Sequence, residues 1–280
     1  MKSFPPSRTF LILLLCANSL CLTAMSQEHP MLSLGALLPL TGSLQSIGHS
    51  SQAAIELGVE DVNAYLVRQN VPYQVEANIR DTATDPARAA QAAQELIQSG
   101  HPFLIGPFAS SCLEAVKPIV DSHPALVLSP GSSSTRLSLP NDRIFRLVPD
   151  DSRQGDAISY YLQKKGITRV FAVYLNDSFG SSLITQSKKF MEERGGHYEV
   201  IFAIEPTLVD FTEPVSQLNQ AVSQALGEVE AASVAVHIIA YEQTIPIFEK
   251  AAAHPALSQV TWIGNDGFTG NSDLLNHPAA

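Results

Sequence analysis

The stretch from residue 103 to residue 135 constrains the fold of this chain more than any other. A short apolar run at 103–105 stops at Gly106 and Pro107, as expected for a buried strand that ends in a turn. Apolar residues at helical spacing follow, and a second apolar run at 125–128 stops before Pro130 and Gly131. The stretch therefore predicts two consecutive parallel strands joined by a helix.

Both predicted strands end in turns that are rich in hydroxyl groups. Ser110 and Ser111 follow the first strand, and residues 132–135 follow the second. In open α/β sheets, ligands bind outside the carboxyl ends of the strands. We therefore expect the two turns to form a small polar cradle that suits a carboxylate, with a plain polar loop at 132–135 as the alternative.

The rest of the chain repeats the alternation of strands and helices. Strand-like runs at 32–40 and 73–79 each precede a segment with a helical apolar face, and the same rhythm restarts after residue 149. Such alternation predicts parallel sheets with right-handed crossovers. We expect an α/β fold of two doubly wound parallel-sheet lobes, the first at 27–148 and the second at 149–280.

The N-terminus has the pattern of a secretory signal peptide. Lys2 and Arg8 flank the start of an apolar run at 10–16, and small residues around Ser26 favour cleavage there. We therefore expect residues 1–26 to be a signal peptide and the protein to be exported. A buried N-terminal helix and an uncleaved membrane anchor are the alternatives. Cys112 is then the single cysteine of the mature chain, so no internal disulfide is expected.

Charge and motifs exclude several classes of function. The net charge of −10 argues against nucleic acid and anionic membrane surfaces as partners. The eight histidines show no metal-ligand spacing, and no nucleotide-binding motif is present, so neither a metal nor another cofactor is expected. A serine hydrolase that uses Ser110 or Ser133 would lack an identifiable base. We expect a binding protein and not an enzyme, with His237 as a core histidine.

Several segments, in this order, resemble a known family. They are LGALLPLTG, the turn from Asp81 to Pro86, FLIGPFASS, VLSPGSSST and NDSFG. They resemble the type I periplasmic-binding fold and, within it, the branched-chain-amino-acid (leucine/isoleucine/valine-type) substrate-binding proteins of ABC importers. The resemblance implies a periplasmic protein that captures an amino acid or a similar small carboxylate for an importer permease. The alternatives are a ligand-sensing module of a signalling receptor and a truncated, non-functional remnant.

The resemblance also implies which residues bind the ligand on each lobe. On the first lobe, Ser110 would bind the ligand carboxylate, while Gly131, Ser132 and Ser133 would supply backbone and hydroxyl groups. On the second lobe, Phe179 and Tyr241 would cover the ligand, and Asp266 would pair with its ammonium group. Cleft-edge packing for Phe179 and Tyr241, and a plain turn role for Asp266, are the alternatives.

The chain departs from the family pattern in two places. Ile47 stands where amino-acid binders often carry an aromatic residue. The sequence also ends at Ala280, before the segment with which family members return to the first lobe. We therefore expect an incomplete first lobe, with a single crossing between the lobes and with apolar surface left uncovered.

Overall fold

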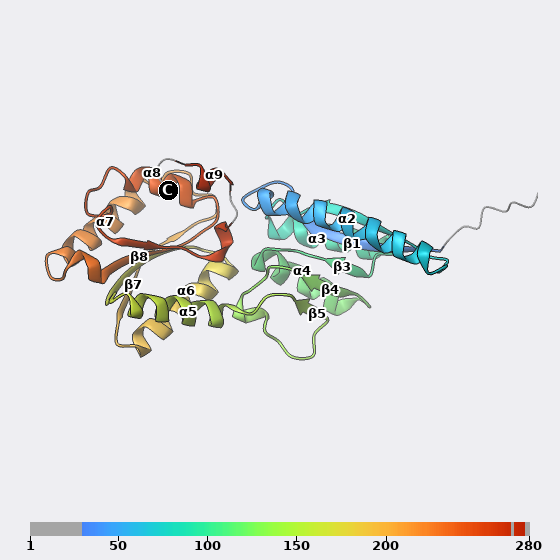
Figure 1. The fold of residues 1–280 in the computed structure, drawn as a ribbon, viewed down its shortest axis with the longest axis horizontal. Coiled ribbons are helices and arrows are strands. Elements are labelled where there is room, and N and C mark those ends of the chain that lie inside the picture. The colour runs from blue at the N-terminus through green and yellow to red at the C-terminus, as the bar shows by residue number, and fades with distance from the viewer. Residues whose placement is uncertain (1–29, 270–271, 278–280) are drawn as a thin grey trace, which may run out of the picture.

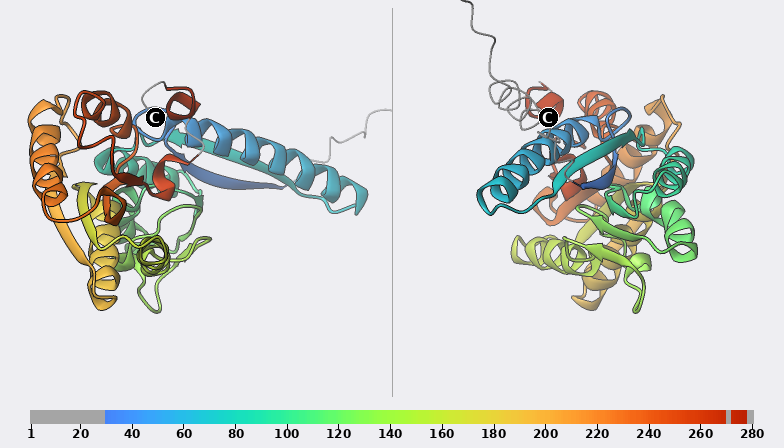
Figure 2. Two further views of the ribbon diagram at one scale, coloured as in Figure 1. Left: turned by 60° about the vertical axis from the view of Figure 1, so that its left-hand side comes forward. Right: turned by 90° about the vertical axis from the view of Figure 1, so that its right-hand side faces the viewer.

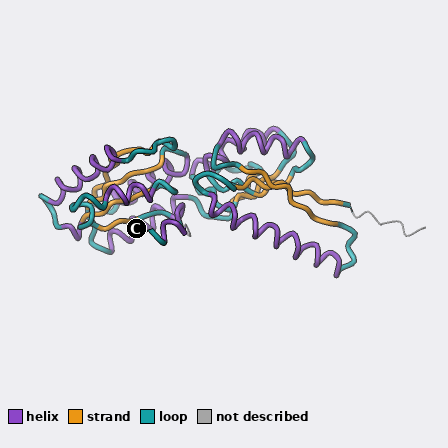
Figure 3. Tube along the Cα trace, turned by 90° about the horizontal axis from the view of Figure 1, so that it is seen from above, coloured by secondary structure: helices purple, strands orange, loops and turns teal. Residues whose placement is uncertain are grey.

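The fold consists of two parallel β-sheets with helices on both sides, and one side of the first sheet is only partly covered. The structure is a computed structural model that describes residues 30–269 and 272–277, so the predicted signal peptide lies outside the described residues. The two sheets form two lobes side by side (Figure 1), and each sheet has helices on both sides when seen from above (Figure 3). The prediction of an α/β fold with two parallel sheets is confirmed.

The first lobe contains five strands and three helices: β1 (Met31–Leu38), α2 (Gln45–Arg68), β2 (Gln74–Asp81), α3 (Pro86–Gln98), β3 (Phe103–Ile105), α4 (Ser110–Ser122), β4 (Leu126–Ser129) and β5 (Ile144–Arg146). The second lobe contains α5 (Asp151–Lys164), β6 (Arg169–Leu175), α6 (Ser178–Glu193), β7 (His197–Ile204), α7 (Thr212–Leu226), β8 (Val234–Ile239), α8 (Thr244–Ala251) and β9 (Thr261–Ile263). Three short 3₁₀ turns, η1 (Thr135–Leu137), η2 (Ala231–Ser233) and η3 (Asp266–Phe268), and the short helix α9 (Ser272–Leu275) complete the described elements.

The strand order places the polar turns where ligands bind in this kind of sheet. The first sheet has the order β2-β1-β3-β4-β5 and the second β7-β6-β8-β9, with all neighbours parallel. The chain reverses its winding direction between β1 and β3, and again between β6 and β8. Because crevices open at such switch points, the loops after β1 and β3, and those after β6 and β8, are the natural site-forming loops. The loop after β4 lies beside the loop after β3.

Capping residues explain where the helices nearest these loops begin. The Asp85 side chain accepts a hydrogen bond from the Arg88 N–H at 2.7 Å, so α3 starts at Pro86 as the sequence predicts. Asp150 and Asp177 cap α5 and α6 in the same way. Apolar periodicity by itself indicates starts at about 154 and 181, three residues later than those of the structure. The earlier caps bring the first turns of α5 and α6 into the space between the lobes.

A buried histidine anchors the sheet of the second lobe. His237 lies on β8 with no exposed surface, and the Tyr198 hydroxyl on β7 lies 2.6 Å from its Nδ1. Burial lowers the pKa of His237 to about 3, so the ring is neutral in the folded protein. The expected core histidine is therefore found in the core.

The first sheet has one covered face and one face with exposed apolar side chains. Leu104 and Val127 are buried on the side of α3 and α4. On the other face, Ile105, Leu128 and Phe145 lie in one row across three strands. Phe103 and Phe145 are each 55% exposed. The expected uncovered apolar surface is thus present on this lobe.

The long helix α2 covers little of the sheet beside it. Of its 24 residues only Gly48 is buried, and α2, β1 and β2 project together beyond the rest of the lobe (Figure 2). Leu57, Tyr65 and Val67 on α2 are more than half exposed. Among the described residues, no helix is long and apolar enough to cross a membrane.

The exposed face predicts self-association through Phe103 and Phe145. The double variant Phe103→Ser, Phe145→Ser is expected to keep a melting temperature close to that of the wild type, because both rings are half in solvent already. It should self-associate less in sedimentation velocity at rising concentration, since apolar patches drive association. Val209→Ser is the control, because Val209 is 90% exposed but lies on the other lobe. Unchanged self-association of the double variant would contradict the prediction.

His237 predicts a specific pH dependence of stability. In the unfolded chain the ring takes up a proton below about pH 6.5, whereas the folded protein keeps it neutral down to about pH 3. The free energy of unfolding should therefore fall as the pH drops below about 6.5, by up to about 1.4 kcal/mol per pH unit from this residue. Asparagine cannot titrate in this range. For His237→Asn, the free energy of unfolding measured with denaturant should therefore fall less steeply with decreasing pH, by that amount per pH unit. Equal slopes would mean that His237 is charged in the folded state.

Candidate ligand-binding site

A cavity lies between the lobes at the carboxyl ends of the strands. Its volume is about 60 Å³, which is smaller than the roughly 300–1,000 Å³ of typical small-molecule sites. Every predicted site residue except Ser132 lines it. The lining residues are Phe108, Ser110, Gly131, Ser133, Val148, Phe179, Tyr241, Asp266 and Gly267. The sequence analysis did not identify Phe108, Val148 and Gly267 as lining residues. They lie in or next to the predicted turns, but they have no polar side chain that would indicate a binding role.

The Ser110 hydroxyl joins the two turns of the first lobe. Ser110 is the first residue of α4 and is only 2% exposed. Its Oγ accepts hydrogen bonds from the backbone N–H groups of Ser133 and Ser134, both at 3.2 Å. A hydroxyl also has one hydrogen to donate. Ser110 can therefore hold the turn after β4 and still offer its own O–H to a ligand oxygen.

The turn after β4 depends on close approach and on internal hydrogen bonds. A Cβ at Gly131 would lie 2.5 Å from the Phe108 ring, so a larger residue there would force this ring to move. The Ser132 hydroxyl donates to the Phe108 carbonyl at 3.0 Å and accepts from the Ser129 hydroxyl at 2.9 Å. Ser132 has no exposed surface. Its hydroxyl therefore holds the turn, and Ser132 does not line the cavity.

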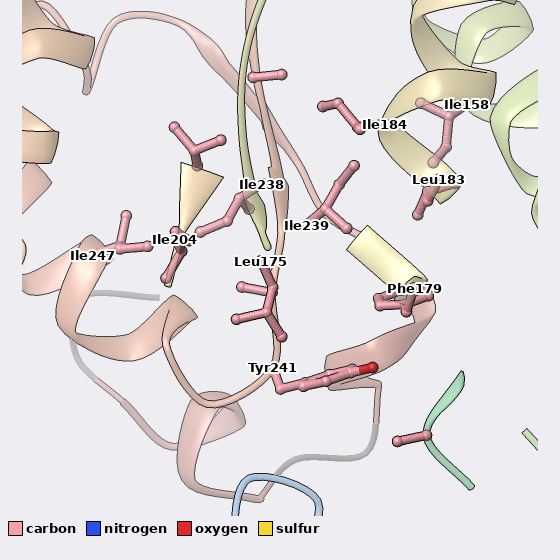
Figure 4. Close-up of a cluster of buried hydrophobic side chains, with 14 of the residues drawn as sticks. Ile158, Leu175, Phe179, Leu183, Ile184, Ile204, Ile238, Ile239, Tyr241 and Ile247 are labelled. Carbon is pink, nitrogen blue, oxygen red and sulfur yellow. The ribbon is translucent and has the colours of Figure 1, made fainter. Parts of the chain in front are cut away.

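Two stacked aromatic rings form the wall of the second lobe. Phe179, in the first turn of α6, and Tyr241, just after β8, have ring centroids 5.5 Å apart and planes 11° apart. Both are almost fully buried and pack into a cluster of aliphatic side chains that includes Leu175 and Ile239 (Figure 4). Burial raises the pKa of Tyr241 well above its usual range, so the phenol stays neutral. The rings thus serve both as core packing and as cavity wall.

Asp266 reaches the cavity from the turn after β9. The neighbouring Asn265 amide donates to the carbonyls of Ile238 at 3.1 Å and Ala240 at 3.3 Å, which ties this turn to the end of β8. Asp266 is exposed at the wall. Desolvation by the walls raises its pKa despite a hydrogen bond from Gln154. Sequence reasoning found Asp266 but missed the anchoring role of Asn265.

A second carboxylate, which sequence reasoning missed, lies behind the cradle. Asp151 opens α5, has no exposed surface, and donates its N–H to the Ser133 carbonyl at 2.8 Å. Burial raises the pKa of Asp151 to about 6. In the sequence, Asp151 is part of an acidic pair at 150–151, which is typical of the start of a helix. Sequence alone does not show that Asp150 is half-buried and Asp151 fully buried.

Hydroxyl pairs connect the cradle to α6 of the other lobe. Ser178 Oγ donates to Ser134 Oγ at 3.1 Å, and the Thr135 N–H donates to Ser182 Oγ at 2.9 Å. The arrangement places hydroxyl and backbone donors on one wall and a carboxylate on the other, as a zwitterion requires. No histidine among the described residues hydrogen-bonds to Ser110 or Ser133, so the cavity offers no serine nucleophile with its base.

Comparison with known proteins identifies relatives over most of the chain. Residues 32–242 match the sequence profile of a family described as periplasmic binding protein. An uncharacterised protein of Methanocaldococcus jannaschii is 27% identical over 90% of this chain and 61% of its own length. The leucine-, isoleucine-, valine-, threonine- and alanine-binding protein of Pseudomonas aeruginosa is 25% identical over 65% of this chain and 49% of its own length.

Solved structures share the fold at lower identity. The leucine-binding protein LivK of Thermotoga maritima has a TM-score of 0.72 and 22% identity, with 84% of this chain and 63% of that chain covered. A solute-binding protein of an R. palustris ABC transporter, solved with benzoate, has a TM-score of 0.70 and 19% identity, with 89% and 66% covered. The chain thus spans less than two thirds of the length of these proteins.

The family match covers the first sheet, strands β6 to β8 of the second sheet, both switch points and the cavity loops up to Tyr241. The relatives and structural neighbours that are named for a function are binding proteins, in agreement with the expectation of a binding protein from the sequence. The chain belongs to the periplasmic binding protein family.

Proposed function

We propose that this protein is an exported, periplasmic solute-binding protein that captures an amino acid or a similar small carboxylate and delivers it to the permease of an ABC importer. Residues 27–148 and 149–280 would form the two ligand-binding lobes. The observation that carries the proposal is the pairing, across one cavity, of the Ser110 cradle with Asp266. The cradle suits a carboxylate, and Asp266 suits an ammonium group.

The names of the similar proteins support both kinds of solute in this proposal, amino acids and other small carboxylates. The Pseudomonas aeruginosa relative is named for binding leucine, isoleucine, valine, threonine and alanine. The R. palustris structure holds benzoate, which has a carboxylate and no amine. Both kinds of solute share a carboxylate, which is the group that the cradle is built to receive. Ligand contacts to both lobes would favour a closed arrangement of the lobes.

Isothermal titration calorimetry tests the proposal. The protein should bind at least one solute from a panel of the twenty amino acids, benzoate and the amine-free acids isovalerate, isocaproate and hydrocinnamate. Each titration should fit a single site, because one cavity holds all the predicted contacts. Absence of binding by every member of the panel would contradict the proposed function.

Ser110→Ala should weaken binding of any carboxylate ligand. The variant removes a hydrogen bond to a charged group, with an expected loss of about 1.5–3 kcal/mol, or tenfold or more in affinity. It also leaves the N–H groups of Ser133 and Ser134 without their acceptor, so a lower melting temperature should accompany the loss. Ser111→Ala, one residue along α4 and outside the cavity lining, is the matched control. Unchanged affinity of Ser110→Ala would remove Ser110 from the site.

Asp266→Asn should discriminate between the two kinds of solute. The substitution keeps the shape of the side chain but removes its charge, so an amino acid loses its ammonium partner. Since Asp266 is an exposed residue, we expect a loss of about 2 kcal/mol, at the lower end of the range for charge pairs. An amine-free acid of the same skeleton should lose far less. Equal losses for both solutes in calorimetry would show that Asp266 has only a structural role.

A further inference from the structure

The ligand cavity is bounded by two lobes that already contact each other. Ser178 Oγ on α6 donates to Ser134 Oγ at 3.1 Å, and the Thr135 N–H donates to Ser182 Oγ at 2.9 Å. Both hydrogen bonds join the turn after β4 to the second lobe, beside the cavity. The space that remains between the lobes is about 60 Å³. Because a single water occupies roughly 10–15 Å³ of such a space, the cavity has room for about four to six groups of that size.

The Phe108 ring forms part of the first-lobe wall, and the fold holds it in place. Phe108 lies in the turn after β3 and lines the cavity. Its ring lies against the backbone of Gly131, where an added Cβ would be 2.5 Å from the ring. The Phe108 carbonyl accepts a hydrogen bond from Ser132 Oγ at 3.0 Å. The preceding carbonyl, of Pro107, accepts one from Ser129 Oγ at 2.7 Å, so the backbone that carries the ring is fixed on both sides of the Phe108 N–H.

The aromatic wall of the second lobe is packed against the core behind it. The stacked rings of Phe179 and Tyr241 are only 4% and 5% exposed. Buried aliphatic side chains, among them Leu175 and Ile239, belong to the same core cluster (Figure 4). Because protein cores are close-packed, a solute that pushed these rings back would strain the core of the lobe.

A second space, beyond Gly267, does not extend the cavity. Leu44 and Ile47 at the start of α2, together with Phe268, line this space, and Gly267 lines both spaces. A Cβ at Gly267 would lie 2.8 Å from the Tyr241 ring, so the Gly267 backbone packs closely against that ring. The volume beyond it is about 10 Å³, which is room for at most about one water. A long side chain of a solute therefore has no room in the direction of Ile47.

The polar contacts of the proposed function use most of the available space. The Ser110 cradle would hold the carboxylate of a solute, and Asp266 would hold an ammonium group. The carboxylate, the ammonium group and the carbon between them already fill most of a cavity of this size. Little space is then left for a side chain.

We propose that the closed cleft selects small solutes, namely glycine, alanine and carboxylic acids of comparable size, and that Phe108 is the specificity-determining residue that sets this limit. The inference rests on the proposed solute-binding function and narrows its ligand class. A solute with a longer side chain, such as leucine, has to displace the Phe108 ring or hold the lobes apart. The first change strains the turn after β3, and the second breaks the hydroxyl pairs between the lobes.

Calorimetry with two series of solutes of rising size tests the limit. One series is glycine, alanine, valine and leucine, and the other is acetate, propionate, isovalerate and isocaproate. In whichever series binds, the wild type should bind the two smaller members about tenfold or more tightly than the two larger ones, because overfilling a fixed pocket is unfavourable. Binding of leucine or isocaproate as tight as that of the smaller members would overturn the inference and leave the proposed function standing. Binding of no member of either series would overturn both.

Phe108→Ala should shift the preference toward larger solutes. The variant keeps the backbone carbonyl that holds the turn and removes the ring, so the freed space can accept a longer side chain. The ratio of leucine affinity to alanine affinity should rise about tenfold or more, as expected for added apolar contact in a pocket. Phe108→Leu, which keeps an apolar side chain against Gly131, is the second variant if the alanine variant does not fold. It should shift the ratio in the same direction.

Phe248→Ala is the matched control. Phe248 on α8 is half-buried like Phe108, but its ring packs against Trp262, with ring centroids 5.1 Å apart, and does not line the cavity. This variant should have a lower melting temperature and an unchanged ratio of leucine to alanine affinity. A ratio that stays at the wild-type value in the folded Phe108 variants would overturn the role of Phe108.

Discussion

The rest of the site depends on two hydrogen bonds, which the Ser110 hydroxyl accepts from the backbone N–H groups of Ser133 and Ser134. They fix the turn after β4 against the start of α4, so that two loops from neighbouring strands act as one surface. Gly131 makes this approach possible because any larger residue would collide with Phe108. The bonds of Ser132 to the preceding turn complete the arrangement. The result is a rigid set of donors at the edge of the first sheet.

The second lobe faces this surface, and it also does so with loops at the carboxyl ends of parallel strands. Its strands also end at a switch point, but there they present stacked rings and a carboxylate in place of hydroxyl groups. Hydroxyl pairs between the cradle and α6 hold the two lobes together at one side of the cavity. The other side stays open at its mouth. One wall of the cavity thus presents hydroxyl and backbone donors, and the other presents a carboxylate.

Much of the fold and of the candidate site could be predicted from the sequence, and the features that could not be predicted have physical reasons. The strand positions and the cavity residues on both lobes followed from apolar runs, turn chemistry and the family resemblance. The starts of α5 and α6 did not, because periodicity reports the buried face and not the cap that begins a helix. The role of the Ser132 hydroxyl and the burial of Asp151 were also out of reach. Both depend on which neighbours surround a side chain, and a single sequence does not specify those neighbours.

Backbone amide chemical shifts measured during titration test the central claim most directly. On saturation with an amino acid that binds, the largest shifts of the ¹⁵N-labelled protein should occur at Gly131, Ser133 and Ser134 and at Gly267 across the cleft. The same residues should shift in the same order with every bound amino acid, because the carboxylate and ammonium contacts are common to all of them. Large shifts confined to residues outside the cavity, such as the surface around residues 226–233, would contradict the account.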